Sequence, residues 1–418
     1  MNILFVVPYT PNRIRTRPYN FICNLSRRGH SITLATLWEN EQERTDLQGL
    51  EQNGIKIISA HLTKAQSAWN TLAALPTRVP LQAVYCWQPK LIRRIDSQLS
   101  NGHFDVIHVE HLRGVHYGLW LKSRLLKSNR RTPIVWDSVD CISYLFEQAA
   151  RSSRSLVGRL VTRLELNRTR RYEGRLVGQF DRLLAAAAID KSALERLAKD
   201  YNHSKNIANA NSENITVLSN GVDLDFFAPQ DQPRESDTLV LSGKMSYHAN
   251  ITAALYLVND IMPLIWSKRS NVRVWIVGKD PSASVRQLST RYPERVRVTG
   301  TVSDIRPYLS RASVAVCPVR YGAGIQNKVL EAMAMATPVV ATPQAVSALQ
   351  TRDGEHLLIG NGTEAFAETV VRVLEDGQLQ QKVGQTGRRY VEKYHDWDAI
   401  TKDLEAIYNG QPRTSTLE

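Results

Sequence analysis

The chain has 418 residues, of which 43% are hydrophobic and 22% charged, and its formal net charge is +13. This length exceeds what one hydrophobic core supports, so we expect two domains of about 200 residues each. The longest apolar run, LLAAAAI at 183–189, is far shorter than the roughly 18 residues of a membrane-spanning helix. Four scattered cysteines lack metal or disulfide spacing, and the first residues read as a strand rather than a signal peptide, so we expect a cytoplasmic protein.

The positive charge is confined to the first half of the chain. Residues 1–222 contain 31 Lys and Arg against 18 Asp and Glu, whereas residues 223–418 contain 22 of each. The density is highest at 151–182, where nine Arg face three acidic residues. Such a surface predicts an anionic partner, namely a membrane face, a phosphorylated acceptor or nucleic acid, or else a merely solvated helix. Nucleic acid is disfavoured because no zinc spacing, RNA-binding signature or aromatic-interleaved basic strand is present.

The first half alternates apolar, β-branched runs with segments of helical periodicity. The helix at 19–30 should end at Gly29, because Arg27 and Arg28 in its last turn favour the helix dipole and glycine favours the C-cap. A long helix is predicted at 152–180. Strand–helix alternation predicts a parallel, doubly wound sheet with ligands beyond the carboxyl ends of its strands. The predicted strands lie at 2–8, 31–37, 54–62, 104–112, 133–138, within 181–190 and at 215–223.

A polar, proline-bearing segment at 223–237 lacks periodicity and is predicted to be a hinge. Beyond it the pattern restarts, with a helix at about 251–267. We therefore expect an α/β fold of two Rossmann-like, doubly wound parallel-sheet domains facing across a cleft, at 1–222 and 238–385. Residues 386–418 should form a C-terminal helix that packs back toward the first domain, and a tail. The strands predicted for the second domain lie at 238–244, 272–278, 295–300, 313–318, 339–342 and 356–360.

The stretch YGAGIQNKVLEAMAMATP, at 321–338, lies between two of these strands. A strand, a glycine loop and a helix N-terminus form a ready anion site, since the first-turn N–H groups point outward and the helix dipole is positive there. Lys328 and Glu331 are three residues apart and project from one face of this helix. This combination suits a ligand with phosphates and hydroxyls, such as a sugar nucleotide. The competing interpretation is that the glycines serve packing alone.

Several motifs now converge on one family. NGVDLDFFAP, LSGKMSYHAN, VWIVGKDPS, VTGTVSDIRPYL and GAGIQNKVLEAMAMATPVVAT occur in this order, after FDVIHVEH. Together they resemble the retaining glycosyltransferases of family 4, which have the GT-B fold. The resemblance is closest to the sugar transferases associated with bacterial exopolysaccharide export and the exosortase system. It extends over nearly the whole chain and is strongest at 220–342.

The resemblance implies roles for individual residues. Glu331 would hold the ribose hydroxyls of the nucleotide, Lys244 would contact the diphosphate, and Val302 lies in the loop against which the base packs. His111 is the candidate for the histidine near the reacting centre, in competition with His108 and His116. Cations and N–H groups aimed at the diphosphate leaving group would lower the barrier without a metal. The implied catalytic residues are His111, Lys244 and Glu331, and the implied donor-binding residues are Arg15, Lys244, Val302, Gly324, Ile325, Gln326, Asn327, Lys328 and Glu331.

The sequence departs from the family at three places. Ala323 stands where the family often has a Glu that meets the donor sugar. The second phosphate-binding Lys is absent from 246–250, and the Gly-Gly loop after the first strand is replaced by TPNRIRTRP at 10–18. Lys328 could restore one missing cation, and Arg13 or Arg15 another.

The resemblance implies a glycosyltransferase that uses a nucleoside-diphosphate sugar, UDP- or GDP-linked, and no cofactor or metal. It would transfer the sugar with retention to a glycan or lipid-linked glycan in exopolysaccharide or cell-surface polysaccharide synthesis. The basic first domain would face the acceptor and contact an anionic membrane peripherally, at the inner face of the cytoplasmic membrane. Two alternatives remain, a sugar-nucleotide epimerase on the same fold and a non-catalytic sugar-nucleotide-binding or assembly protein.

Overall fold

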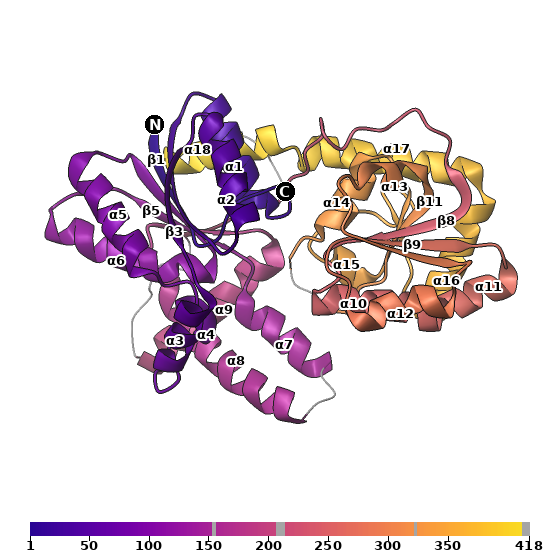
Figure 1. Cartoon of the computed structure of the whole chain (residues 1–418), viewed down its shortest axis with the longest axis horizontal. Coiled ribbons are helices and arrows are strands. Elements are labelled where there is room, and N and C mark those ends of the chain that lie inside the picture. The colour runs from indigo at the N-terminus through magenta and orange to yellow at the C-terminus, as the bar shows by residue number, and fades with distance from the viewer. Residues whose placement is uncertain (153–155, 206–213, 322–323, 412–418) are drawn as a thin grey trace. The chain divides into compact units, whose positions relative to one another are not determined.

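The computed structural model (Figure 1) describes residues 1–152, 156–205, 214–321 and 324–411, with the backbone alone at 149–152 and 156–163. The chain divides into two compact units. The first contains Met1–Ser219 and the residues from Asp398 to the end of the last helix, and the second contains Asn220–Trp397. The return to the first unit therefore comes later than the expected 386. The reason is that α17 (Gly377–Tyr394) buries Tyr390 and Val391 in the core of the second unit.

The first unit is built on a parallel sheet, and its described residues form seven strands in the order β3-β2-β1-β4-β5-β6-β7. The predicted doubly wound topology is thus confirmed, with the strand order reversing between β1 and β4. Such strands are buried on both faces, which is why their sequences read as continuous apolar runs. The strands are β1 (Asn2–Val7), β2 (Ser31–Trp38), β3 (Lys56–His61), β4 (Val106–Glu110), β5 (Ile134–Val139), β6 (Arg182–Ala185) and β7 (Ile215–Val217).

Helices cover both faces of this sheet. On one face, Leu4 and Val6 belong to the cluster that includes α5 and α6. The predicted end of α1 is confirmed, because Gly29 has a φ of +87° and its N–H donates to the carbonyl of Ser26 at 3.0 Å. The helices are α1 (Thr16–Arg27), α2 (Glu41–Gln52), α3 (Lys64–Ala74), α4 (Leu81–Val84), α5 (Pro89–Asn101), α6 (His111–Lys127), α7 (Ile142–Ser152), α8 (Leu156–Leu176), α9 (Ala188–Lys205) and α18 (Trp397–Tyr408).

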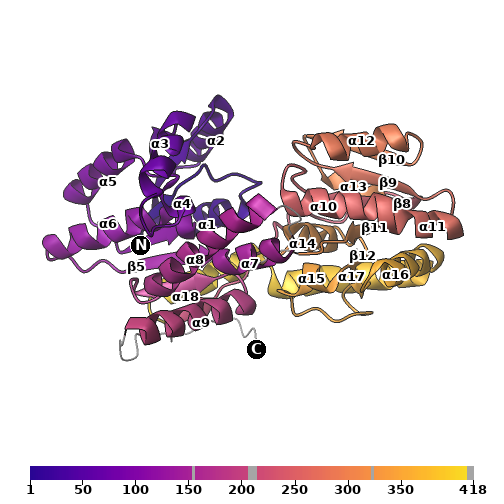
Figure 2. The same ribbon diagram turned by 90° about the horizontal axis from the view of Figure 1, so that it is seen from below.

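The second unit is also built on a parallel sheet, and its described residues form six strands in the order β10-β9-β8-β11-β12-β13. In Figure 2 the labels β10, β9, β8, β11 and β12 follow one another in this order. The order reverses between β8 and β11. The strands are β8 (Glu235–Ser242), β9 (Arg273–Val277), β10 (Val296–Gly300), β11 (Ala312–Cys317), β12 (Val339–Ala341) and β13 (Leu358–Ile359).

Two apolar cores fill the two faces of the second sheet. Helices α10, α11, α12 and α16 lie on one face, and α13, α14 and α17 lie on the other (Figure 1). The helical elements are α10 (His248–Tyr256), the π-helical turn η2 (Leu257–Ile261), α11 (Met262–Lys268), α12 (Ala283–Arg291), α13 (Arg306–Arg311), α14 (Asn327–Ala334), α15 (Pro343–Val346), α16 (Thr363–Glu375) and α17.

Three expected boundaries differ from the structure. The long helix α8 begins at Leu156 and ends at Leu176, inside the predicted 152–180. The helix predicted at 251–267 is interrupted by η2. Strand β8 begins at Glu235, within the predicted hinge, because Glu235 pairs with Ala312 of β11 and its carbonyl accepts a hydrogen bond from Ser313 at 2.6 Å. Its polar side chains concealed this start.

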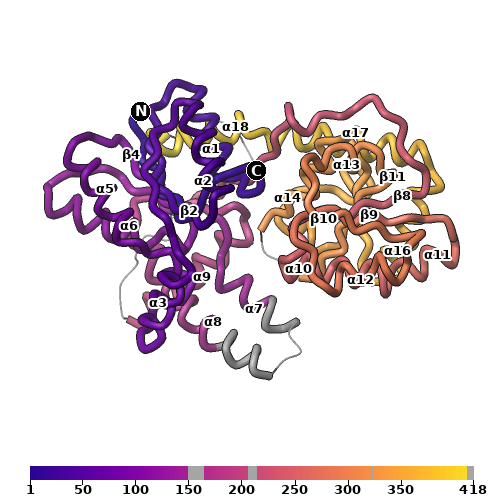
Figure 3. Tube along the Cα trace, viewed as in Figure 1, coloured from indigo at the N-terminus to yellow at the C-terminus, as the bar shows by residue number. Residues whose placement is uncertain are grey.

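The last helix belongs to the first unit. Figure 3 shows α18, in yellow, beside the indigo N-terminal elements. Arg28 at the end of α1 holds Glu405 of α18 in a bidentate ion pair, with distances of 2.6 and 2.7 Å. Tyr408 of α18 contacts Nδ1 of His108 in β4 through its hydroxyl, at 2.7 Å. The first unit is therefore completed by residues from both ends of the described chain.

Candidate functional site

In the second unit, the predicted donor-binding residues follow strands on both sides of the point where the strand order reverses. Lys244 follows β8 and is exposed, whereas Gly324 to Glu331 follow β11. Val302 follows β10, is partly buried and packs against the core of this unit. The carboxyl edge of a parallel sheet at such a reversal is the usual place for a ligand. The structure thus brings these predicted residues to one edge of one sheet.

Two glycines allow the loops at this edge to approach each other. Gly243 directly follows β8 and Gly278 directly follows β9, with φ values of +141° and +151°. A Cβ on Gly278 would lie 1.8 Å from the carbonyl oxygen of Gly243. The loop that carries Lys244 therefore rests directly on the backbone of the neighbouring loop.

Lys328 is tied to the same loop. Its ammonium donates to the side-chain oxygen of Asn250, and the amide nitrogen of Asn250 donates to the carbonyl of Lys244 at 3.0 Å. Asn250 is buried, so this link has a fixed geometry. The Lys328 ammonium is consequently held beside the backbone of the loop that carries Lys244.

Glu331 lies one turn further along α14 and is partly buried. Loss of hydration on burial raises the pKa of its carboxyl to about 7, and the nearby charge of Lys328 opposes this rise. A carboxylate in such a setting gains from partners that donate hydrogen bonds to it, as vicinal hydroxyls do.

Gly324 precedes α14 in the loop that follows β11. Gly324 has a φ of +71°, a left-handed conformation that glycine adopts without strain. Ile325 is buried, and Gln326 occupies the N-cap position without a side-chain hydrogen bond to the helix. Asn327 is the first residue of α14. The departure at Ala323 lies outside the described residues.

One contact at this edge was not predicted from the sequence. The Tyr321 hydroxyl lies 3.0 Å from Nδ1 of His248 and 3.1 Å from the hydroxyl of Thr252. The rings of Tyr321 and His248 stack with centroids 5.4 Å apart. The loop after β11 is therefore joined to the first turn of α10. In the sequence, the segment around His248 differs from the family pattern by a missing Lys. The histidine itself does not indicate this contact.

In the first unit, the corresponding edge carries His111, which begins α6 directly after β4. It has a φ of +62°, a strained conformation for a residue with a Cβ. Burial, assisted by the charge of Arg113, lowers the pKa of its imidazole to about 3. His111 is therefore neutral at physiological pH. His108 is fully buried and His116 contacts Tyr172, so neither occupies this edge in the same way.

Arg15 lies near this edge but is engaged within its own loop. Its guanidinium forms an ion pair with Glu43 at 3.1 Å and donates to the carbonyl of Thr10 at 3.1 Å. It also lies over the ring of Tyr9, 5.0 Å from the centroid. Arg15 is thus a held cation rather than a mobile one. Its predicted contact with a donor remains a prediction.

Sequence reasoning missed Glu110, the last residue of β4. It is 1% exposed, and Oε1 accepts a hydrogen bond from the Tyr9 hydroxyl at 2.6 Å. Among the described residues, Oε2 of Glu110 has no hydrogen-bond partner. Burial raises the pKa of Glu110 to about 8, and the charge of Asp137 adds to the rise. The signal available in the sequence was a carboxylate at the end of an otherwise apolar strand.

A second missed feature is the buried pair Arg17–Asp137. Nε and Nη2 of Arg17 lie 2.7 and 3.1 Å from the two carboxylate oxygens of Asp137. Nη1 of Arg17 also donates to the carbonyl of Leu218 at 2.9 Å. His108 lies between Asp137, at 3.6 Å, and Tyr408. This network joins α1, β4, β5 and α18 beneath the edge that carries Glu110 and His111.

The raised pKa of Glu110 predicts that the stability of the first unit depends on pH. Because the folded pKa is above the unfolded one, the folded state keeps a proton that the unfolded state releases, and stability falls as pH rises from about 4.5 to 8. Glu110→Gln removes this effect. We expect the free energy of unfolding of Glu110→Gln, minus that of wild type, to increase by roughly 3 kcal/mol between pH 5 and pH 8. Urea unfolding at a series of pH values measures this. The exposed Glu39→Gln is the control, and a pH-independent difference for Glu110→Gln would contradict the assignment.

Residues 236–376 match one protein family, described as "Glycosyl transferases group 1". This range includes Lys244, Val302 and the segment from Gly324 to Glu331. The match covers nearly all of the second unit's sheet and includes the strands and loops that carry the candidate site.

The curated proteins that are similar to the chain include two whose names contain inositol. The phosphatidyl-myo-inositol mannosyltransferase of Mycobacterium leprae (strain TN) is 26% identical over 199 residues, which cover 46% of this chain and 52% of that protein. The chain thus spans about half the length of this relative. The D-inositol 3-phosphate glycosyltransferase of Kribbella flavida is 24% identical over 365 residues, covering 81% of this chain and 78% of that protein.

Solved structures show the fold. The HepE protein of Anabaena, in complex with UDP and glucose, has a TM-score of 0.63 and 14% identity, with 98% of this chain and 100% of that chain covered. The chain accordingly has the GT-B fold, with two parallel-sheet α/β units. None of the described helices combines the length and the apolar character needed to cross a membrane.

Proposed function

We propose that the chain is a retaining, metal-independent glycosyltransferase of family 4 type that uses a nucleoside-diphosphate sugar. The observation that carries this proposal is the edge of the second sheet where Lys244, Lys328 and Glu331 lie together within the group 1 match. Two cations and a helix N-terminus suit a diphosphate, and a half-buried carboxylate suits ribose hydroxyls. The similarity to a protein solved with UDP and glucose supports a UDP-linked donor, with GDP as the other candidate.

In this proposal the second unit lowers the barrier by electrostatics. As the glycosidic bond breaks, the bond electrons pass to the diphosphate, and its growing negative charge is stabilised by Lys244, Lys328 and the N–H groups at the start of α14. Gly324 and Gln326 allow the backbone to approach the phosphate oxygens. Val302 packs against the base. Glu331 holds the ribose and thereby fixes the leaving group.

For the acceptor we propose a glycan or a lipid-linked glycan in the synthesis of exopolysaccharide or another cell-surface polysaccharide. The similar proteins include a capsular polysaccharide biosynthesis glycosyltransferase of Staphylococcus aureus and a lipopolysaccharide core biosynthesis glycosyltransferase of Rhizobium meliloti. The names of the two relatives described above include phosphate-bearing inositol compounds. The excess positive charge of the first half suits an acceptor at the anionic inner face of the cytoplasmic membrane.

Glu331→Ala tests the donor site. Losing a carboxylate that accepts hydrogen bonds from two hydroxyls should weaken UDP binding about 10- to 100-fold. Isothermal titration calorimetry measures this, with Glu364→Ala, an exposed glutamate of the same unit, as the control. Nucleotide release from a panel of UDP- and GDP-sugars then tests transfer. Binding without turnover of any donor, even with membrane extract as acceptor, would favour the non-catalytic alternative over the enzyme. A nucleotide sugar altered without an acceptor would favour the epimerase.

A further inference from the structure

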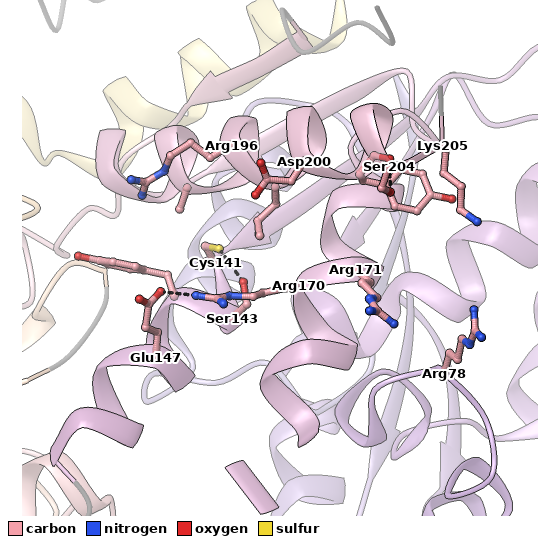
Figure 4. A pocket seen from close by; sticks show the side chains of 14 residues that line it. Arg78, Cys141, Ser143, Glu147, Arg170, Arg171, Arg196, Asp200, Ser204 and Lys205 are labelled. Atoms are coloured by element: carbon pink, nitrogen blue, oxygen red, sulfur yellow. Dashed lines mark hydrogen bonds and ion pairs between the residues drawn. The ribbon is translucent and has the colours of Figure 1, made fainter. Parts of the chain in front are cut away.

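A basic hollow lies in the first unit between α7, α8 and α9, and none of the residues named above for the candidate site lines it. Its volume is about 940 Å³, within the range of ligand pockets. Five cationic side chains from three segments line it, namely Arg78, Arg170, Arg171, Arg196 and Lys205. Figure 4 shows Arg78, Arg171 and Lys205 at one end of this hollow, with Arg196 toward the other.

The charges in the hollow are not balanced. Arg170 forms an ion pair with Glu147 at 2.9 Å, drawn as a dashed line in Figure 4. Within the part of the chain that the structure describes, Arg78, Arg171, Arg196 and Lys205 form no ion pair. Besides Glu147, the carboxylate that lines the hollow is Asp200. A surplus of positive charge therefore faces one concave space, and it belongs to the half of the chain that carries the whole net charge.

The chemistry of the lining favours a phosphate. Guanidinium groups present planar pairs of donors that match phosphate oxygens, and an ammonium adds a point charge. The hydroxyl groups of Ser143 and Ser204 also line the hollow. A membrane surface would contact cations on a convex face, whereas these cations surround a concavity. The shape thus favours one discrete anionic group over a bilayer.

The position of the hollow connects it with the candidate site of the same unit. Cys141 and Ser143, which line it, follow β5, and Ala193 belongs to α9, which follows β6. In a parallel sheet these positions share the carboxyl edge with the ends of β1 and β4, where Tyr9, Glu110 and His111 lie. An anion bound here would belong to a molecule that also extends along that edge.

We propose that this hollow binds a phosphate or diphosphate group carried by the acceptor. Arg171 forms its contacts together with Arg78 and Lys205 at the same end of the hollow, and Arg196 supplies further charge from the other end. That the anion belongs to the acceptor rests on the proposed function, whereas the binding of an anion rests on the hollow alone. The phosphate belongs either to a lipid-linked diphosphate or to a phosphorylated head group.

The test is calorimetry on the full chain in saturating UDP, so that the donor site is occupied. The probes are inorganic pyrophosphate, farnesyl diphosphate and inositol 1-phosphate. We expect Arg171→Ala/Arg196→Ala to bind the preferred probe at least about tenfold more weakly than wild type, and binding to weaken with salt. Lys90→Ala/Arg93→Ala, two exposed cations of α5, is the matched control and should bind as wild type does. Tightest binding of farnesyl diphosphate indicates the lipid-linked source, and that of inositol 1-phosphate the head group.

Equal affinities of wild type and Arg171→Ala/Arg196→Ala would overturn the proposal, as would binding to phosphatidylglycerol vesicles but to none of the three probes. If this variant does not fold, Arg78→Ala/Lys205→Ala takes its place with the same criterion. UDP affinity, measured separately, should stay within about twofold of wild type in either variant, since these residues line no part of the donor site. The two proposals can fail separately. If wild type neither binds UDP nor transfers sugar, but the variant binds pyrophosphate more weakly than wild type does, the proposed function is wrong and the anion site is supported.

Discussion

Gly278→Ala is expected to destabilise the second unit by about 4 kcal/mol or more. The added Cβ would lie 1.8 Å from the carbonyl oxygen of Gly243 and 2.8 Å from its carbonyl carbon. Both atoms are backbone, so no side chain can rotate away. The φ of +151° at Gly278 adds strain for any residue with a Cβ. Relief requires separation of the loops after β8 and β9, which also displaces Lys244.

Hydrogen exchange of the full chain, followed by mass spectrometry of peptides, measures this effect unit by unit. Peptides from β8 and β9 should lose protection in Gly278→Ala, whereas those from β1 and β4 should not. Gly377→Ala is the matched control, because a Cβ there meets no atom within 4 Å. Protection equal to wild type in β8 and β9 would show that the loops tolerate a side chain and that their contact is not fixed. UDP affinity should fall in parallel with the lost protection.

The second large effect is expected for Asp137→Asn, which should lower the free energy of unfolding of the first unit by about 3–5 kcal/mol. The exposed fractions of Arg17 and Asp137 are 4% and 0%, so the variant leaves a buried guanidinium without its counter-ion. Asp96→Asn is the matched control, since the Arg124–Asp96 pair has the same 2.7 Å distance but exposed fractions of 38% and 40%. An exposed pair of this kind contributes less than about 1 kcal/mol.

The same residue predicts an acid limit. Burial alone would raise the pKa of Asp137, but the charge of Arg17 and the nearby imidazole of His108 outweigh it and lower the pKa to about 2. A lowered folded pKa gives stability that is present above the unfolded pKa near 4 and is lost as pH falls toward 2. The difference between wild type and Asp137→Asn in urea unfolding should therefore shrink over this interval. A difference that stays constant from pH 5 to pH 2.5 would contradict the ion pair.

The fold could be predicted from local sequence patterns, because these patterns depend on neighbouring residues alone. Runs such as Ile3–Val7 and Val314–Cys317 are apolar throughout because both faces of each sheet are covered, and this property does not depend on distant partners. Helix ends were predictable where one residue sets the backbone, as at Gly29. The start of β8 was not, because Glu235 is held by a strand more than seventy residues away.

The candidate site likewise has residues that the sequence predicts and contacts that it does not. Lys244, Lys328 and Glu331 could be named because they lie in short motifs beside strands. The link through Asn250 could not, since it depends on how two loops meet. In the first unit, Glu110 could have been noticed as a carboxylate at the end of an apolar strand, but only the sheet brings Arg17 and Asp137 together. Long-range polar networks of this kind leave little trace in spacing.

The C-terminal helix gives the chain an order of assembly. The ribosome makes most of the first unit before the second, but Glu405 and Tyr408, which contact Arg28 and His108, are made after both. The continuous segment Asn220–Trp397 can reach its final contacts while the first unit still lacks α18. The first unit is thus begun before the second and completed after it, and His108 stays uncovered by Tyr408 until α18 has been made.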